Sequence, residues 1–206
     1  MPLLRIEKLK QGGMLGLWQM TEHPSCDERL WKEVQSLFHH EGRQREYVCV
    51  RLLLRAMVGS DLVTIDHLPD GKPFLKGDAR AVSISHTRGF CAVLLADESC
   101  GIDIEYVSNR VDRIAHRFMR ADETATDTLG RLLVWSAKES LFKLCSDDHL
   151  TYEQMRITGY EAGIAERPND VSRPILLTGE NLSSGQAFAI RAVLTEKYVL
   201  TWCMSK

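Results

Sequence analysis

Some segments of the chain have short apolar runs typical of strands, and others repeat apolar residues with the period of a helix. This succession limits the folds that the sequence can adopt. Residues 2–8 and 14–20 form two short apolar runs on either side of Gly12 and Gly13. Two consecutive glycines suit a tight turn that needs positive φ, so this segment predicts a β-hairpin. Within residues 43–58 the apolar side chains recur at i, i+3, i+4 and i+7, which predicts a helix.

The other elements follow in a similar succession. Residues 24–40 predict a helix that Pro24 and Ser25 open, with Asp27 and Glu28 in its first turn. The remaining predictions are a turn at 69–73, strands at 81–85, 90–96 and 100–105, helices at 111–119 and 121–145 with a break near Arg120, and a closing hairpin at 187–194 and 198–204. Strands followed by helices, twice over, predict an α+β fold.

Composition excludes several classes of protein. The 206 residues include 26 basic and 28 acidic side chains, for a net charge of −2. A chain so nearly neutral is unsuited to tracking nucleic-acid phosphates along a broad surface. No run of about 18 apolar residues predicts a membrane span, and no signal peptide is evident, so we expect a cytoplasmic protein. The six cysteines contain no C-x-x-C pair, which argues against a cysteine zinc site.

Two carboxylates lie two residues apart in the predicted strand at 100–105. Because alternate side chains share one face of a strand, Ile102 and Ile104 should point to the core, and Asp103 and Glu105 should point together to the other side. Two carboxylates this close repel each other unless a cation lies between them. Taken alone, the pattern favours a half-buried strand with a solvated acidic face.

The helix predicted at 121–145 carries a second charged group. Glu139 and Lys143 are four residues apart, so they form an i, i+4 pair, and Lys138 lies on another side. The structural interpretation is a surface ion pair worth about 0.3–0.5 kcal/mol. The functional interpretation is a third carboxylate for a metal beside an ammonium for a phosphate.

Two short motifs add phosphate-binding side chains. Ser85 and His86 stand where a predicted strand ends, and hydroxyl and imidazole donors there can bind phosphate oxygens or make an ordinary turn. Lys72 precedes Pro73, whose ring restrains the backbone beside the lysine. Each motif is weak evidence by itself.

The four motifs occur in the order GKP, SISHT, GIDIE and WSAKESLFK. In this combination the chain resembles the 4′-phosphopantetheinyl transferase superfamily, in its larger, surfactin-synthetase-activating type, over about residues 43–145. The resemblance implies two similar α+β halves about a pseudo-twofold axis, with coenzyme A in the cleft between them. The halves would be residues 1–100 and 101–206, the second carrying the metal ligands.

The resemblance also implies a role for each motif residue. Asp103, Glu105 and Glu139 match the magnesium ligands, and Lys143 matches a lysine near the pyrophosphate. The residues implied to bind coenzyme A are Arg45, Lys72, Pro73, Ser85, His86, Lys138 and Lys143. Arg45 is the preferred contact for the 3′-phosphate, with Arg51 and Arg55 as alternatives.

The implied reaction moves the 4′-phosphopantetheine arm of coenzyme A to a serine of an apo acyl or peptidyl carrier protein and releases 3′,5′-ADP. Glu139, directly or through a metal-bound water, is the candidate base, and magnesium or manganese could serve. The carrier could come from fatty-acid, polyketide or peptide synthesis, and we expect a monomer. The segment 144–150 lacks the glycines that many relatives have after the last lysine. The resemblance therefore does not define the shape of that loop.

Two alternatives from other classes remain. One is a homologue that binds coenzyme A without transfer, which single-turnover assays with an apo carrier protein would reveal. The other is a magnesium-dependent phosphohydrolase, which would release inorganic phosphate.

Overall fold

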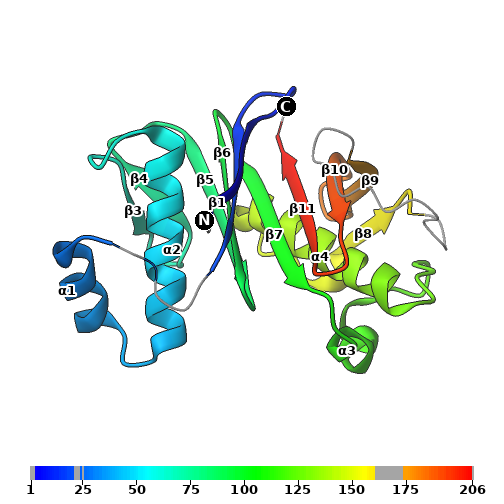
Figure 1. Cartoon of the computed structure of the whole chain (residues 1–206). Coiled ribbons are helices and arrows are strands. Elements are labelled where there is room, and N and C mark those ends of the chain that lie inside the picture. Colours follow the sequence, from blue (N-terminus) through cyan, green and yellow to red (C-terminus); the bar gives the residue numbers. More distant parts are fainter. Residues whose placement is uncertain (1–2, 21–23, 25, 161–173, 206) are drawn as a thin grey trace. The chain divides into compact units, whose positions relative to one another are not determined.

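The computed structural model describes residues 3–20, 24, 26–160 and 174–205. The chain divides into two compact units, Met1–Asp97 and Glu98–Lys206, each built from an antiparallel sheet and helices (Figure 1). The predicted α+β class is therefore confirmed. In the part of the chain that is described, no helix is both long and apolar enough to cross a membrane.

The sheet of the first unit has the order β1-β2-β6-β5. Its strands are β1 (Leu3–Lys8), β2 (Met14–Gln19), β5 (Ala81–Thr87) and β6 (Phe90–Ala96). The predicted hairpin of β1 and β2 is confirmed, with φ of 93° at Gly12 and 81° at Gly13, whereas Pro2 lies outside the described residues. β5 continues two residues beyond its predicted end at Ser85, because its pairing with β6 extends to Thr87.

Two helices and a small hairpin complete the first unit. Helix α1 (Glu28–Leu37) begins later than predicted, because Asp27 is its N-cap and accepts a hydrogen bond from the backbone N–H of Leu30 at 2.8 Å. Ser25 lies outside the described residues. Helix α2 (Glu41–Val58) begins two residues before its predicted start, and its C-cap is Gly59, where φ is 68°.

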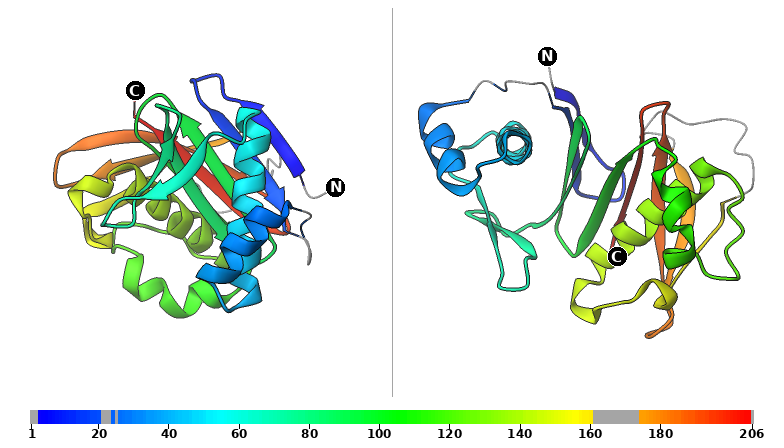
Figure 2. Two further views of the ribbon diagram at one scale, coloured as in Figure 1. Left: turned by 90° about the vertical axis from the view of Figure 1, so that its left-hand side faces the viewer. Right: turned by 90° about the horizontal axis from the view of Figure 1, so that it is seen from below.

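Strands β3 (Thr64–His67) and β4 (Pro73–Lys76) pair on either side of the turn predicted at 69–73. The strands themselves were not predicted, since four residues are too few for a clear alternation. The right-hand view of Figure 2 looks along α2, with the β3–β4 hairpin to one side of it. Leu53 and Met57 of α2 pack against Gly16 of β2, so the core of this unit lies between helix and sheet.

The sheet of the second unit has the order β7-β11-β10-β9-β8. Its strands are β7 (Cys100–Tyr106), β8 (Met155–Thr158), β9 (Ile175–Asn181), β10 (Gln186–Leu194) and β11 (Tyr198–Met204), and every neighbouring pair is antiparallel. The closing hairpin of β10 and β11 is confirmed, whereas β8 and β9 were not predicted. Two 3₁₀ turns, η1 (Ser146–Asp148) and η2 (Tyr152–Gln154), precede β8.

Helices α3 (Arg110–Phe118) and α4 (Thr128–Leu144) accompany this sheet. The helix predicted at 121–145 is shorter than expected, because Asp127 caps α4 and accepts a hydrogen bond from the N–H of Gly130 at 2.6 Å. The apolar residues of α4 and of the sheet form the core of the unit, with Leu133, Ala137 and Leu141 at 0% exposure.

Helix α4 approaches β7 closely at Gly101. A Cβ atom added there would lie 1.9 Å from the carbonyl oxygen of Ser140, so only glycine allows this approach. Polar contacts hold the helix in place: the Thr201 hydroxyl lies 2.9 Å from the Ser136 hydroxyl and 2.7 Å from that of Ser140. All three side chains are buried and hydrogen-bonded, as buried hydroxyls require.

Candidate functional site

The two carboxylates of β7 face α4. Asp103 pairs with Thr201 across the sheet, and Thr201 is bonded to α4, so Asp103 and Glu105 lie on the helix-covered face. The predicted alternation is confirmed, but its direction is not: Ile102 and Ile104 lie on the face opposite α4, outside the core cluster of helix and sheet, although they are 0% and 1% exposed. The expectation of a solvated acidic face is wrong, since Asp103 is only 4% exposed.

Lys143 crosses from α4 to this strand. Its ammonium donates to the carbonyl oxygen of Ile102 at 2.8 Å and to Asp103 Oδ1 at 2.9 Å. Lys143 therefore pairs with Asp103 of the strand instead of forming the i, i+4 surface pair with Glu139. The reason is the close packing of α4 on β7, which brings a buried carboxylate within reach of the lysine.

Two neutral aromatic donors hold the other two carboxylates. Trp135 Nε1 donates to Glu105 Oε1 at 2.9 Å, and the Tyr152 hydroxyl donates to Glu139 Oε1 at 2.8 Å. Trp135 belongs to the recognised motif, but Tyr152 was missed. The sequence Thr151-x-x-Gln154 predicts the capping box that is observed at η2, yet it gives no sign of where the Tyr152 side chain points.

The electrostatics of Glu105 and Glu139 reflect burial and a shared negative charge. Burial raises the pKa of Glu105, and the neighbouring Asp103 raises it further. Burial also raises the pKa of Glu139; the Tyr152 hydrogen bond opposes this rise, and Asp103 adds to it. The ionised forms are thus disfavoured until a positive charge compensates them.

The donor set is chemically suited to a hard cation. Asp103, Glu105 and Glu139 supply only carboxylate oxygens, the ligands that magnesium prefers, and each senses the charge of another. Among the described residues, however, no three His, Cys, Asp or Glu side chains are already grouped as metal ligands. The magnesium site therefore stays a prediction.

Lys138 has a different environment from the one predicted beside coenzyme A. Its side chain is completely buried, and its ammonium lies 2.9 Å from Glu123 Oε2. The same ammonium donates to the carbonyl oxygens of Phe118 at 2.7 Å and Tyr152 at 3.2 Å. This corrects the sequence-based expectation: Lys138 joins α4 to α3, η2 and the segment between the helices, and it offers no surface to a ligand.

The first unit carries the other predicted residues. Ser85 and His86 are adjacent in β5, so they point to opposite faces of the sheet. The His86 imidazole lies 3.5 Å from Glu46 of α2. Lys72 ends the β3–β4 turn immediately before Pro73, and its backbone N–H donates to Asp70 at 2.9 Å.

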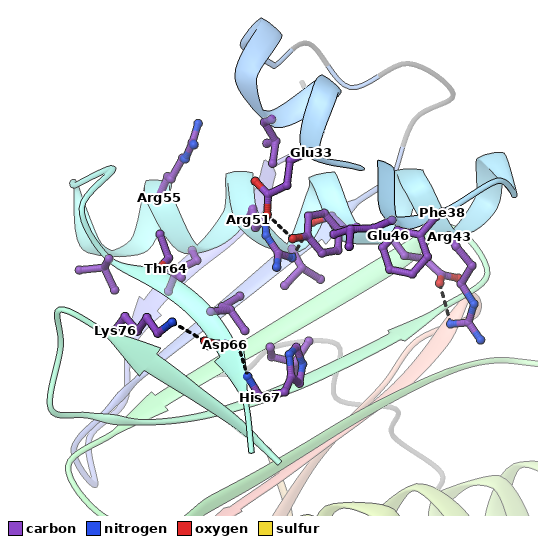
Figure 3. A pocket seen from close by; sticks show the side chains of 18 of the residues that line it. Glu33, Phe38, Arg43, Glu46, Arg51, Arg55, Thr64, Asp66, His67 and Lys76 are labelled. Atoms are coloured by element: carbon purple, nitrogen blue, oxygen red, sulfur yellow. Dashed lines mark hydrogen bonds and ion pairs between the residues drawn. The ribbon is translucent and has the colours of Figure 1, made fainter. Parts of the chain in front are cut away.

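A cavity of about 770 Å³ opens within the first unit beside α2, between α1 and the β3–β4 hairpin (Figure 3). Seven basic or imidazole side chains contribute to its lining: Arg29, Arg43, Arg51, Arg55, His67, Lys76 and His86. Several of them have acidic partners, such as Arg43 with Glu46 at 2.9 Å and Lys76 with Asp66 at 2.5 Å. Among the residues predicted to bind coenzyme A, His86 lines this cavity, as do the alternative candidates Arg51 and Arg55.

The three candidate arginines of α2 differ in their partners. The Arg55 guanidinium contacts Asp27 at 2.7 Å and Asp61 at 3.1 Å, so its charge is already balanced. Arg51 lies over the Tyr47 ring at 3.1 Å from the centroid and points into the cavity (Figure 3), where burial lowers its pKa. Arg45 Nε is buried and has no hydrogen-bond partner among the described residues.

Comparison with known proteins gives one family. The model of the 4′-phosphopantetheinyl transferase superfamily matches residues 99–203, which contain β7, α4 and the three carboxylates. No curated protein matched the chain in the corresponding search.

Lys138→Met should test the structural assignment of this lysine. Removing one partner of a buried ion pair leaves Glu123 uncompensated, so we expect the free energy of unfolding to fall by about 3–5 kcal/mol. Urea denaturation would measure the change. Lys197→Met, at an exposed lysine of the β10–β11 turn, is the control and should be nearly neutral. A stable Lys138→Met protein with weakened coenzyme A binding would instead support the original prediction.

Glu105→Gln should change how stability depends on pH. Because the folded pKa of Glu105 is raised, its ionisation lowers stability as pH rises from the unfolded pKa, about 4.3, through the folded value. Glutamine cannot ionise and still accepts from Trp135. Melting curves of both proteins should be recorded without magnesium at pH 4 and pH 8. The melting temperature of the variant minus that of wild type should be higher at pH 8 than at pH 4. An equal difference at the two pH values would contradict the raised pKa.

Proposed function

We propose, because the chain belongs to the 4′-phosphopantetheinyl transferase superfamily, that it transfers the 4′-phosphopantetheine arm of coenzyme A to a serine of an apo carrier protein. The observation that carries the proposal is the group formed by β7 and α4, where Asp103, Glu105 and Glu139 lie in electrostatic reach of one another beside Lys143. Both elements lie inside the matched region.

The residues that would hold magnesium are Asp103, Glu105 and Glu139. Magnesium, when bound, would neutralise charge on the pyrophosphate of coenzyme A. The carboxylates supply the negative charge that attracts the cation. Lys143 balances only part of that charge, because its ammonium contacts Asp103 alone among the three.

The reaction is a phosphoryl transfer. The serine oxygen of the carrier forms a bond to the β-phosphorus of coenzyme A, and the bond from that phosphorus to the oxygen bridging to the nucleotide breaks, releasing 3′,5′-ADP. Glu139 is proposed to accept the serine proton, and the Lys143 ammonium to donate to phosphate oxygens as charge accumulates.

The nucleotide contacts are assigned to the first unit. Arg45 remains the preferred residue for the 3′-phosphate, since its Nε is buried without a hydrogen-bond partner among the described residues, while Arg55 is balanced by two aspartates. His86 lines the basic cavity beside α2 and supports a phosphate contact there. Lys72 is held at a hairpin end, where its side chain is partly exposed.

We also propose that the chain is of the larger, surfactin-synthetase-activating type. The family match begins at residue 99, and the preceding residues form a further α+β unit of their own. A chain with two such units is what that type requires.

The carrier protein is proposed to dock on the basic face of α3, defined by Arg110, Arg113, His116 and Arg117. All four side chains are exposed, and α3 follows the carboxylate-bearing strand β7 after three residues. Within the described residues no ion pair engages Arg113 or Arg117, whereas Asp112 on the same helix is bound to Arg131 at 2.8 Å. Carrier proteins are usually acidic helical bundles, which such a face would attract.

The transfer itself is tested by mass spectrometry of an apo carrier protein incubated with this protein, coenzyme A and magnesium. We expect the carrier to gain one phosphopantetheine. Glu139→Gln keeps the volume and an acceptor for Tyr152 but loses the base and a ligand, so the rate should fall about 10²-fold or more. Glu153→Gln, at an exposed glutamate of η2, is the control and should retain the wild-type rate.

Other outcomes separate the alternatives. Coenzyme A binding without any mass gain on the carrier would favour a binding protein. Release of inorganic phosphate without modification of the carrier would favour a phosphohydrolase. Either result would overturn the proposed transfer.

Charge reversal tests the docking face. Arg113→Glu/Arg117→Glu should raise KM for the carrier protein by about tenfold or more and leave KM for coenzyme A unchanged, because it places like charges opposite an acidic partner. The difference from wild type should shrink as salt is added. Lys8→Glu/Lys10→Glu, an equal charge change at exposed residues of the β1–β2 hairpin, is the control. Equal effects of both double variants would contradict docking at α3.

A further inference from the structure

Tyr152 lies outside every recognised motif, yet its side chain contacts Glu139, one of the three clustered carboxylates. The residue belongs to η2, eight residues after α4 ends, and its hydroxyl donates to Glu139 Oε1 at 2.8 Å. Tyr152 therefore donates to one oxygen of Glu139.

Three sets of contacts fix the position of this phenol. In the capping box of η2, the Gln154 side chain accepts from the backbone N–H of Thr151 at 2.9 Å and from its hydroxyl at 3.0 Å. The backbone oxygen of Tyr152 accepts from the buried Lys138. The Tyr152 ring packs on Trp135, with centroids 5.4 Å apart.

The packing partner of Tyr152 is itself tied to a second carboxylate. Trp135 donates to Glu105 and packs edge-on against Phe118, with ring centroids 5.0 Å apart and planes at 70°. The Phe118 carbonyl accepts from Lys138, the same lysine that bonds the backbone of Tyr152. The rings of Trp135 and Tyr152 and the buried Lys138 are thus connected by direct contacts. Together they set the orientation of Glu105 and Glu139.

We propose that Tyr152 is a positioning residue, whose hydroxyl holds Glu139 so that Oε2 faces the reacting groups. This inference rests on the proposed function. Within the described residues Glu139 Oε2 has no hydrogen bond, so it is the oxygen left to bind a cation or take a proton. A neutral donor fixes the carboxylate without cancelling its charge, whereas a lysine in the same place would cancel it.

Tyr152→Phe tests this role because it removes only the hydroxyl. We expect kcat to fall about tenfold with KM for coenzyme A and for the carrier unchanged, since Glu139 loses its orientation and not its contact with either substrate. Calorimetric titration of the protein with magnesium alone should show about tenfold weaker binding. The melting temperature without magnesium should stay close to that of wild type, because the ring packing is retained.

Tyr160→Phe is the matched control. Tyr160 packs against the same core, and its hydroxyl accepts from the backbone N–H of Thr124 at 3.0 Å, away from the carboxylates. Tyr152→Leu distinguishes packing from positioning: kcat as low as that of Tyr152→Phe supports the hydroxyl, whereas a wild-type kcat in Tyr152→Phe would overturn the proposal. Equal losses in Tyr160→Phe would overturn it too.

The failure of this inference is distinguishable from the failure of the proposed function. If wild type binds magnesium but modifies no carrier, the function is wrong, and the titration of Tyr152→Phe still decides the role of Tyr152. If wild type transfers and Tyr152→Phe equals it in both kcat and magnesium affinity, the positioning role alone is wrong. A wild type that neither binds magnesium nor transfers would overturn both.

Discussion

The close approach of α4 to β7 at Gly101 is the constraint on which the candidate site depends. A side chain at this position would meet the Ser140 carbonyl oxygen at 1.9 Å, so a larger residue would push the helix away from the strand. The hydroxyls of Ser136, Ser140 and Thr201 satisfy one another where the two elements meet. At this separation Lys143 reaches two atoms of the strand, Ile102 O and Asp103 Oδ1, directly.

The same packing explains why the carboxylates are electrostatically unusual. A solvated acidic strand would have ordinary pKa values, but α4 removes water from one face of β7 and adds Glu139 to the group. Burial disfavours the ionised forms of Glu105 and Glu139, and the negative Asp103 adds to this effect. Under the proposed function, a bound cation would relieve this repulsion and so stabilise the second unit.

Local sequence patterns predicted what depends on local geometry. The period of two in β7 placed Asp103 and Glu105 on one face, and the helical spacing found most of α2 and a helix that contains α4. Patterns could not show that the acidic face is covered, because that depends on β11 and α4, which are distant in sequence. The resemblance assigned Lys138 to the cofactor, and no local pattern could reveal its actual partner. Glu123 lies in a segment that was predicted to be helical, but the cap at Asp127 starts α4 only after that segment.

The two lysines of α4 differ in burial, and this difference separates a structural role from the proposed chemical one. Lys138 is fully buried, and Glu123 cancels its charge, so the pair can support structure but cannot respond to a ligand. The Lys143 side chain is 28% exposed, and its partner Asp103 also raises the pKa of Glu105 and Glu139, so under the proposed function its ammonium is the one available to a charged ligand. Neutral donors, Trp135 and Tyr152, orient the remaining carboxylates without reducing that negative charge. Five positions along α4 thus separate a fully buried ion pair from a partly exposed one, and the proposed contact with a charged substrate is assigned to the exposed pair.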